Sequence, residues 1–554
     1  MATSIIRLCV SIAEEHFGPL VGAVVGSLGK KGRQTLMGLQ RVTGLKVPVL
    51  RQCLFVLMHH HCLSYAQSEE GRGKEQTYYQ LKTEELLERA EFPAYLGAAK
   101  EAFGEKGVMI TRELMVHGSI SMKALLNRAS SASNKEKQEI RRVFTRMMSK
   151  RYLRAIRSSD FITTADRKMK AENMEIARLT GPATTKELEA IRARVALAHQ
   201  EEDRKILGLK RRGAPEELES GRASKRHALS GEGELGEDEV KGEDRENGDV
   251  VDEDMLFRLS FAGFHDHLRN KALVRWIANR ISHSASIIVK AMLTLIQPSS
   301  LDPEANRSSS VGLGHISHAV PASLDLAQGI SFPSDGPPPT SDRWELLLTY
   351  MEILVTESSG IILRSDDRGS MGGGEYVVDW ARFLQLRREE TIVRMATERT
   401  GMAGARLWRL ILRRGWLDEK GLGKMALLPA KEGRERIQAL HQLGFVRLQE
   451  VPKSLDRAPN RTFYLWFIDL PFAYASVRRI LLQTLGNVRR RREQEVRERG
   501  HILRRMERPD LIADPSLISP ADRQEKERLE RMVNKLRLAE GRLSGLSSLF
   551  GSPC

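Results

Sequence analysis

Lysine and arginine side chains recur in one stretch of the chain at spacings that suit contact with phosphate. Lys431 and Arg434 lie about one helical turn apart, and Lys453, Arg457 and Arg461 follow within a polar segment. Such side chains neutralise phosphate groups without reading base sequence. We therefore predict these five residues as the nucleic-acid-binding set, with a solvated helix face and an ordinary loop as the alternative.

Residues suited to catalysis or to metal and cofactor binding do not form a recognisable pattern. His59, His60 and His61 are consecutive, and successive helical residues point about 100° apart, so the three cannot converge on one ion. We expect them at the surface or at a helix end. Gly372–Gly374 lacks the Lys of a phosphate loop and is interpreted as a hairpin turn. GxSxG and HExxH motifs are absent. The sequence predicts no catalytic site, no cofactor and no metal.

Composition narrows the class of protein. The 554 residues carry a net charge of +16, and four cysteines at positions 9, 53, 62 and 554 form no CxxC pair. We expect no disulfide framework and no zinc site, which fits a reducing compartment. The N-terminus predicts an amphipathic helix rather than a signal peptide, and no apolar run approaches the about 20 residues that span a bilayer. We expect a soluble intracellular protein of several domains.

The segment Met425–Asp469 must position the basic residues. A helix is predicted from Pro429, and Gly444 is its expected left-handed C-cap. A strand follows from Phe445, then a polar loop, and Thr462–Ile468 is rich in strand-forming residues. Helix, strand, loop and strand, preceded by further helices, make the winged-helix form of the helix-turn-helix. The apolar stripe of the helix consists of Ile437, Leu440 and Leu443.

A helical wheel separates this apolar stripe from a polar face. Lys431, Arg434, Gln438 and His441 fall opposite the stripe, and Arg436 lies near its edge. Arg436 must extend its guanidinium past apolar neighbours to reach water. The outward face is therefore predicted to be basic and polar.

Three earlier stretches have the same pattern of a helix followed by a strand. They are Val49–Gln67 with a return strand near Thr77–Leu81, Ile140–Arg157, and Trp344–Val378. The second stretch has no recognisable return strand close behind it. Four units of one kind predict an array of winged helices.

The third unit is interrupted. It begins with predicted helices at Phe261–Arg280 and Ala285–Leu295, and Pro298–Asp342 separates these from the third helix of the unit. This insertion is rich in Ser, Pro and Gly, and we predict that it is disordered.

The end of the chain is predicted to fold back on itself. Phe472–Val488 and Asp522–Arg542 are apolar at helical spacing, and prolines lie between them. Two such helices form an antiparallel pair, which we interpret as a docking element. Arg489–Arg492 are expected on a solvated helix face, or in contact with phosphate as the alternative.

The fold class is thus mainly α with small β-hairpins: four tandem winged-helix domains plus a C-terminal helical hairpin or coiled coil. The predicted domains are 1–85, 86–160, 255–388 (with the insertion near 298–342) and 389–470 for the four winged helices, 161–254 for a charged and partly disordered linker, and 471–550 for the coiled coil.

Charge is distributed unevenly within the linker. Gly231–Asp254 holds twelve acidic and two basic side chains. The last forty or so linker residues have too little apolar surface to offset the entropy of ordering and are predicted disordered. Arg211 and Arg212 precede Lys225 and Arg226 at the spacing of a bipartite nuclear import signal, which favours location in the nucleus.

Three motifs give the chain a family resemblance. They are AEEHFGPLV at Ala13–Val21, LLPAKEGRERIQAL at Leu427–Leu440 and LQEVPKSLDRAPNRTFYLW at Leu448–Trp466. With these motifs the chain resembles, nearly end to end, the family of RNA polymerase III-specific subunits that carry tandem winged helices and a C-terminal coiled coil.

The resemblance implies a function without catalysis. It implies a subunit of DNA-directed RNA polymerase III that acts in promoter opening and transcription initiation of small RNA genes. The implied partners are two smaller polymerase III-specific subunits in a detachable heterotrimer, the clamp of the largest subunit, the upstream initiation factor and promoter DNA. The loop Pro452–Arg461 corresponds to a family segment that reaches into the polymerase cleft, which implies a position near DNA for its basic residues.

Two other classes of function stay open on the residues alone. A sequence-specific transcription regulator would need side chains suited to base edges on a recognition helix, and Arg and Asn that could pair with bases are sparse on these faces. A scaffold of another large complex usually stacks helical repeats before one terminal winged helix, whereas four units are spread along this chain.

Overall fold

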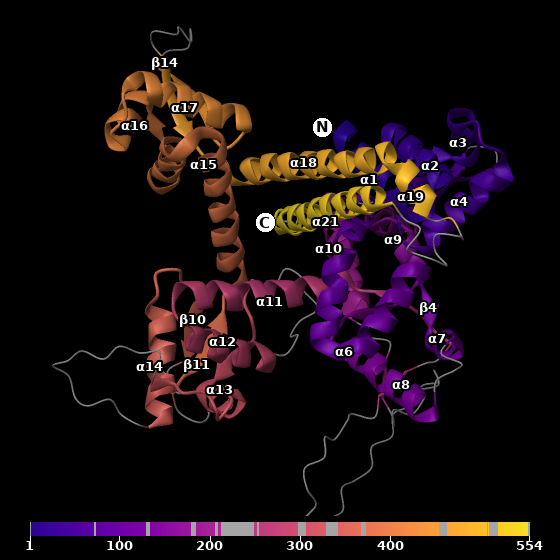
Figure 1. Cartoon of the computed structure of the whole chain (residues 1–554), viewed down its shortest axis with the longest axis horizontal. Coiled ribbons are helices and arrows are strands. Elements are labelled where there is room, and N and C mark those ends of the chain that lie inside the picture. Colours follow the sequence, from indigo (N-terminus) through magenta and orange to yellow (C-terminus); the bar gives the residue numbers. More distant parts are fainter. Residues whose placement is uncertain are drawn as a thin grey trace, which may run out of the picture.

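The computed structural model describes residues 2–70, 74–128, 133–178, 184–204, 209–211, 249–251, 254–296, 306–327, 342–366, 373–453, 462–506, 508 and 519–551. Within these residues the chain is mainly helical and carries four three-stranded antiparallel sheets, each attached to its own group of helices. Figure 1 shows the third and fourth groups on the opposite side of the molecule from the first two. The predicted mainly α fold with small hairpins is confirmed.

All four sheets share one strand order. In each, the last strand in sequence lies between the other two, and two helices separate the first strand from the second. This is the winged-helix topology. The units comprise α2 (Pro19–Lys31), β1 (Gln34–Thr35), α3 (Leu36–Thr43), α4 (Val47–His59), β2 (Leu63–Glu70) and β3 (Lys74–Leu81); α6 (Phe92–His117), β4 (Ile120–Ser121), α7 (Met122–Arg128), α8 (Asn134–Ser149), β5 (Leu153–Ala155) and β8 (Leu256–Leu259); α12 (His283–Leu295), β9 (Val311–Gly312), α13 (Leu313–Ala319), α14 (Arg343–Thr356), β10 (Ile362–Asp366) and β11 (Glu375–Val378); and α15 (Trp380–Arg414), β12 (Leu417–Asp418), α16 (Glu419–Ala426), α17 (Ala430–Leu443), β13 (Arg447–Pro452) and β14 (Thr462–Phe467).

The second unit obtains its return strand from a distant part of the chain. β8 pairs with β4 through Ile120 and Phe257, and with β5 through Leu153 and Leu259. Residues 255–259 were predicted to belong to the third unit, because no segment near β5 alternates like a strand. Phe257 is fully buried and meets Phe144 edge-on, with ring centroids 5.3 Å apart. Burial of this aromatic residue explains why β8 completes the earlier sheet.

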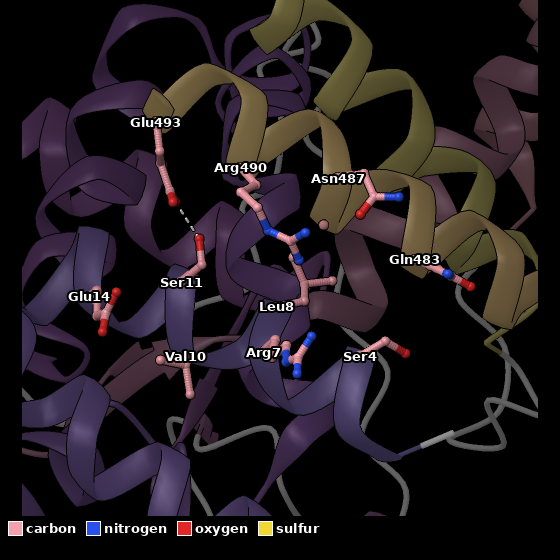
Figure 2. A pocket seen from close by; sticks show the side chains of 11 residues that line it. Ser4, Arg7, Leu8, Val10, Ser11, Glu14, Gln483, Asn487, Arg490 and Glu493 are labelled. Carbon is pink, nitrogen blue, oxygen red and sulfur yellow. Dashed lines mark hydrogen bonds between the residues drawn. The ribbon is translucent and has the colours of Figure 1, made fainter. Parts of the chain in front are cut away.

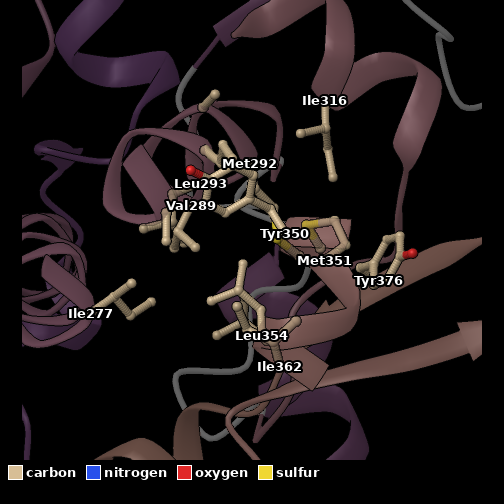
Figure 3. Packing of buried hydrophobic residues seen from close by; sticks show 14 of the residues in the cluster. Ile277, Val289, Met292, Leu293, Ile316, Tyr350, Met351, Leu354, Ile362 and Tyr376 are labelled. Atoms are coloured by element: carbon tan, nitrogen blue, oxygen red, sulfur yellow. The ribbon is translucent and has the colours of Figure 1, made fainter. Parts of the chain in front are cut away.

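The third unit corrects the prediction of a disordered insertion at residues 298–342. Its described part, 306–327, contains β9 and α13. β9 pairs with β11, and Leu313 and Ile316 of α13 are fully buried in the core of the unit. Figure 3 shows Ile316 facing the same cluster as Tyr350 and Met351 of α14. α13 has only seven residues and few of them are apolar. The Ser- and Gly-rich composition around it therefore hides the helix in the sequence.

Further helices and short strands connect the four units. They are α5 (Thr83–Glu88), η1 (Arg89–Glu91), η2 (Ser158–Phe161), α9 (Thr164–Ile176), α10 (Thr185–Arg204), β6 (Leu209–Arg211), β7 (Asp249–Val251) and α11 (Phe261–Arg280). β6 pairs with β7 although residues 249–251 belong to the stretch predicted disordered. Apart from Asp254, the rest of that stretch lies outside the described residues, as do Arg212, Lys225 and Arg226 of the import-type signal.

The C-terminal helices form the predicted antiparallel pair. α18 (Leu470–Glu498) packs along α21 (Pro520–Leu549), with α19 (Gly500–Met506) beyond α18, and α1 (Ala2–Phe17) lies against α18. Figure 1 shows α18 and α21 side by side, spanning from the fourth unit to the first. The two ends of the chain are thereby joined into one body.

Two arginines of the predicted solvated run are buried in this body. Arg489 is 5% exposed and Arg492 is 7% exposed. Arg489 forms an ion pair with Glu15 of α1, and Arg492 lies 2.9 Å from Glu15 and 2.7 Å from Glu540 of α21. Neither solvation nor phosphate contact, the two predicted roles of this run, describes these two side chains.

Each unit has its own apolar core. The third unit buries Tyr350, Met351 and Tyr376 together (Figure 3), and the core of the fourth unit surrounds Trp408 and Leu440. Separate cores are expected because a chain of this length exceeds what one core supports. No helix in the described part of the chain is both long and apolar enough to cross a bilayer.

Candidate nucleic-acid interface

The helix α17 is formed as its sequence predicts. Pro429 is its N-cap residue, and Gly444 ends it in the left-handed conformation at φ 79°. Ile437 and Leu440 are buried in the core of the fourth unit. The opposite face of α17 is therefore presented to solvent.

The predicted polar face of α17 is exposed. Lys431, Arg434, Gln438 and His441 are all solvent-accessible, as the helical wheel predicts. Arg436 is half-buried, with Nε 3.9 Å from Glu432, which agrees with its predicted position at the edge of the stripe. The face carries positive charge near the N-terminus of the helix.

One of these cations already forms an ion pair with a carboxylate. The guanidinium of Arg434 donates a hydrogen bond to Glu419, the first residue of α16, and this bond raises the pKa of Arg434. Both side chains are exposed, and exposed ion pairs contribute little to stability. Phosphate would therefore have to compete with Glu419 for Arg434, whereas Lys431 forms no ion pair among the described residues.

The wing holds the remaining predicted residues. Lys453 directly follows β13, is exposed, and places its ammonium 4.5 Å from the ring centroid of Phe463 on β14. This is the geometry of a cation–π contact, which keeps the charge at the surface. Arg457 and Arg461 lie outside the described residues. The structure thus places three of the five predicted residues on one winged helix.

Two lysines that were not predicted lie on the neighbouring helix. Lys420 and Lys424 are exposed on α16, the helix that carries Glu419. Their spacing of four residues puts them on one side of a helix. Gly421 and Gly423 lower the helix propensity of this segment, which is why the sequence alone does not single it out. In the structure Asp418 caps it, accepting the Gly421 N–H at 3.1 Å.

The three consecutive histidines end α4 and point apart. His59 lies 3.1 Å from Ser119, and His60 lies 3.4 Å from Arg89. His61 is 3% exposed and stacks on Phe161, with centroids 5.1 Å apart, so the expectation of a helix end holds while His61 is not at the surface. Burial, followed by nearby positive charges, lowers the pKa of His61 to about 2. A neutral ring is therefore required in the fold.

One mixed cluster has metal-ligand chemistry. Oxygen atoms of Glu88 and Glu91 and a ring nitrogen of His265 lie within 4.8 Å of one another. The Tyr95 hydroxyl donates to Glu88, and His265 Nε2 lies 3.1 Å from Glu88. Burial raises the pKa of Glu91, and the Glu88 carboxylate outweighs burial to raise that of His265. Hydrogen bonds among Tyr95, Glu88 and His265 tie α5 to α6 and α11.

Three thiols are structural rather than reactive. Cys9, Cys53 and Cys62 are buried and unpaired. Burial raises the pKa of Cys9 to about 12 and that of Cys62 to about 11. The thiolate is the nucleophilic form, so these groups stay protonated and inert near neutral pH.

A small cavity lies between α1 and α18. Its lining mixes charges of both signs, and Ser11 closes it by a 2.5 Å hydrogen bond to Glu493 (Figure 2). Arg7 and Arg490 approach the cavity from the two helices, and Glu14 lies beside it. Opposite charges on one wall suit neither an anion nor a cation, so we assign no ligand here.

Models of one protein family match three parts of the chain. The helix-turn-helix domain of RNA polymerase III subunit RPC82 matches residues 7–68. The model described as RNA polymerase III subunit RPC82 matches residues 142–381. The C-terminal winged-helix domain of POLR3C matches residues 390–468. The last match contains α17 and the wing.

Curated relatives match over nearly the whole chain. The DNA-directed RNA polymerase III subunit RPC3 of Danio rerio is 25% identical over 98% of this chain and 97% of its own length. The subunit of that name from Homo sapiens is 24% identical over 98% and 96% of the two chains. The one from Yarrowia lipolytica is 21% identical over 98% and 97%.

Proposed function

We propose that this chain, which belongs to the RNA polymerase III subunit RPC3 family, also described as RPC82, is a non-catalytic subunit of DNA-directed RNA polymerase III. It acts in promoter opening and transcription initiation of small RNA genes through contacts with DNA and with other subunits. The carrying observation is that similarity to this family extends along 98% of a chain built from four units of one topology.

The fourth unit makes the DNA contact. Lys431, Arg434 and Lys453, with Arg457 and Arg461 of the wing loop, neutralise backbone phosphates. Lys420 and Lys424 of α16 extend this set. The support is that the described members are exposed on one winged helix. Lys and Arg of this kind position a protein on DNA without specifying sequence.

The other winged-helix units bind partner proteins. The partners are two smaller polymerase III-specific subunits, the clamp of the largest subunit and the upstream initiation factor, and the complex works in the nucleus. Physical support comes from the buried ion pairs of Arg489 and Arg492, which fasten α1 to α18 and α21. Because α1, α18 and α21 are held together, the two ends of the chain can form one rigid platform on which partner proteins are placed relative to one another.

Purification tests the assembly directly. The tagged full chain is isolated from nuclei, and co-purifying proteins are identified by mass spectrometry. Recovery of the large subunits of polymerase III is expected, at near-equal amounts. Absence of these subunits, or recovery of an unrelated complex, would refute the proposal.

The role in opening needs a second measurement. Polymerase reconstituted with Lys431, Lys453, Arg457 and Arg461 replaced by Ala is tested for promoter melting by permanganate reactivity. We expect reduced melting with normal subunit assembly. Unchanged melting at moderate salt would leave the chain as a scaffold only.

A further inference from the structure

The third helix of the second unit, α8, carries a basic outer face. Its inner side buries Ile140 and Phe144 in the core of the unit, where the helix packs against α6, α7 and β5. On the opposite side Lys135, Arg142 and Arg146 are exposed, at spacings of seven and four residues. Such spacings place side chains in one row along a helix. Figure 1 shows α8 at the far end of the second unit from α18 and α21.

The row of cations contains a neutral donor and is flanked by polar residues. Gln138 is exposed, three residues after Lys135 and four before Arg142, and therefore lies on the same face. Every exposed residue of α8 is polar. Protein interfaces have an apolar centre depleted of charge, whereas protein–DNA interfaces are more polar and much more positive. The face therefore suits a phosphodiester backbone better than a folded protein surface.

The cations of this face lack acidic partners. Lys135, Arg142 and Arg146 form no ion pair among the residues that the structure describes. Lys150 directly follows α8 and is exposed, and burial together with the positive charge of Arg146 lowers its pKa. Positive charges thus lie close to one another without a counter-charge, and a bound anion would relieve their repulsion.

The acidic side chains of α8 do not cancel this charge. Residues 134–150 contain six basic and two acidic side chains. Glu136 accepts the backbone N–H of Ser133 at 2.9 Å and so caps the helix. Glu139 is exposed at the edge of the face. Asp254 is paired with Lys123 of α7 at 3.2 Å. The outer face of α8 keeps a net positive charge.

The corresponding helices of two other units differ. α14 of the third unit exposes Glu345 and Glu352 and no Lys or Arg. α4 of the first unit exposes one arginine, Arg51, beside Phe55, which is 69% exposed. In contrast, α8 resembles α17 of the fourth unit in exposing several cations. The winged helices of this chain are therefore not equivalent, and charge distinguishes the second and fourth units.

We propose that the outer face of α8 is a second nucleic-acid contact of this chain, in addition to the contact proposed for the fourth unit. Lys135, Arg142 and Arg146 neutralise phosphates, and the amide of Gln138 donates to a phosphate oxygen. A helix about 10–12 Å in diameter fits the major groove of duplex DNA, which is about 12 Å wide. The contact positions the chain without specifying sequence. The inference rests on the proposed function for the identity of the DNA, and other faces of the unit remain for partner proteins.

The salt dependence of DNA binding tests the face. The full chain carries Ala at Lys431, Lys453, Arg457 and Arg461, so that the fourth unit no longer dominates, and fluorescence anisotropy follows binding to a duplex and to a single strand of equal length. We expect this chain to retain binding. Adding Arg142→Gln and Arg146→Gln should lower the slope of log affinity against log salt by about 1.8 for the duplex or about 1.4 for the single strand.

Two control variants separate phosphate contact from net charge. Arg275→Gln with Lys290→Gln removes the same charge from exposed positions of α11 and α12 and should leave the slope unchanged. Arg142→Lys with Arg146→Lys keeps the charge and should restore the slope. An effect confined to one DNA form identifies that form as the ligand. An unchanged slope in the Gln variant, an equal effect of the α11 and α12 variant, or complete loss of binding before α8 is altered would overturn the inference.

Photo-crosslinking identifies the occupant in the assembly. Gln138 is replaced by p-benzoylphenylalanine in the full chain, and purified polymerase bound to promoter DNA is irradiated. We expect a crosslink to DNA. A crosslink to another polypeptide, or to this chain alone, would mean that an acidic segment covers α8 and would overturn the inference. Failure of the chain to co-purify with polymerase defeats the proposed function instead, whereas co-purification without a DNA crosslink defeats this inference alone.

Discussion

Arg492 on α18 donates from Nε to Glu540 on α21 across 2.7 Å, and this ion pair joins the two C-terminal helices. The other end of the same guanidinium reaches Glu15 of α1 at 2.9 Å. Hydrogen bonds from Arg492 and the charge of Arg489 outweigh the effect of burial and lower the pKa of Glu15. The single side chain of Arg492 therefore joins three helices, α1, α18 and α21.

Loss of this arginine is expected to destabilise the protein. Arg492→Met leaves Glu540 with a side chain only 14% exposed and without its cation. Breaking a buried pair costs about 3–5 kcal/mol, and we expect about 2–3 kcal/mol because Glu15 is 42% exposed. Denaturant unfolding measures it. Arg490→Met, an exposed neighbour on the same helix, should change stability by less than about 0.5 kcal/mol.

The distant return strand gives a second stability prediction. Phe257→Ala removes a fully buried ring that meets Phe144. Truncation of a core Phe costs about 3–5 kcal/mol. Thermal unfolding should report a large loss, whereas Leu256→Ala, at a site 47% exposed, should be mild. Equal effects would mean that β8 does not complete the second sheet.

The end of α17 depends on glycine. A Cβ at Gly444 would lie 2.5 Å from Ser476 Oγ, and the backbone there has φ 79°. Gly444→Ala should destabilise by at least about 1–2 kcal/mol, the penalty of the left-handed conformation for a residue with a Cβ. Gly433→Ala is the matched control. It lies inside α17 with no atom within 4 Å of the added Cβ, and it should stabilise by up to about 1 kcal/mol.

Removal of the competing carboxylate should strengthen DNA binding. Glu419→Gln frees Arg434 for phosphate, so affinity for a promoter fragment should rise, and the dependence of log affinity on log salt should steepen by about one unit. Fluorescence anisotropy over a salt series measures both. Glu435→Gln removes an equal charge from exposed α17 without freeing Arg434. If the two variants behave alike, Arg434 does not contact DNA.

Acidification should destabilise the fold through His61. Its pKa is about 2 in the folded chain and 6.5 in the unfolded reference, so the unfolded chain binds the proton more readily between these values. The stabilising contribution is complete above pH 6.5 and is lost progressively as the pH falls through that window. The slope is about 1.4 kcal/mol per pH unit. His61→Phe keeps a ring against Phe161 and should flatten the dependence measured between pH 6 and pH 5. An unchanged slope in the His61→Phe variant would show that His61 does not cause the loss of stability at acid pH.

The sequence alone determined the local elements and their recurrence. Helix periodicity, the cap at Gly444 and the change to strand alternation are properties of neighbouring residues, and the structure confirms them. The exposed face of α17 followed from the same periodicity. The division into domains by residue number, and the assignment of the five basic residues to DNA, stay predictions.

Tertiary structure decided what distant residues do together. β8 joins a sheet whose other strands end about one hundred residues earlier, and α13 is held by a core that its own seven residues do not reveal. In the sequence, Arg492 is one of four consecutive arginines that are expected to be solvated. In the fold, α1 and α21 bring Glu15 and Glu540 into contact with it. Such pairings depend on which surfaces meet in the folded chain. The buried area that stabilises them is formed by segments far apart in sequence, and neither segment alone indicates its partner.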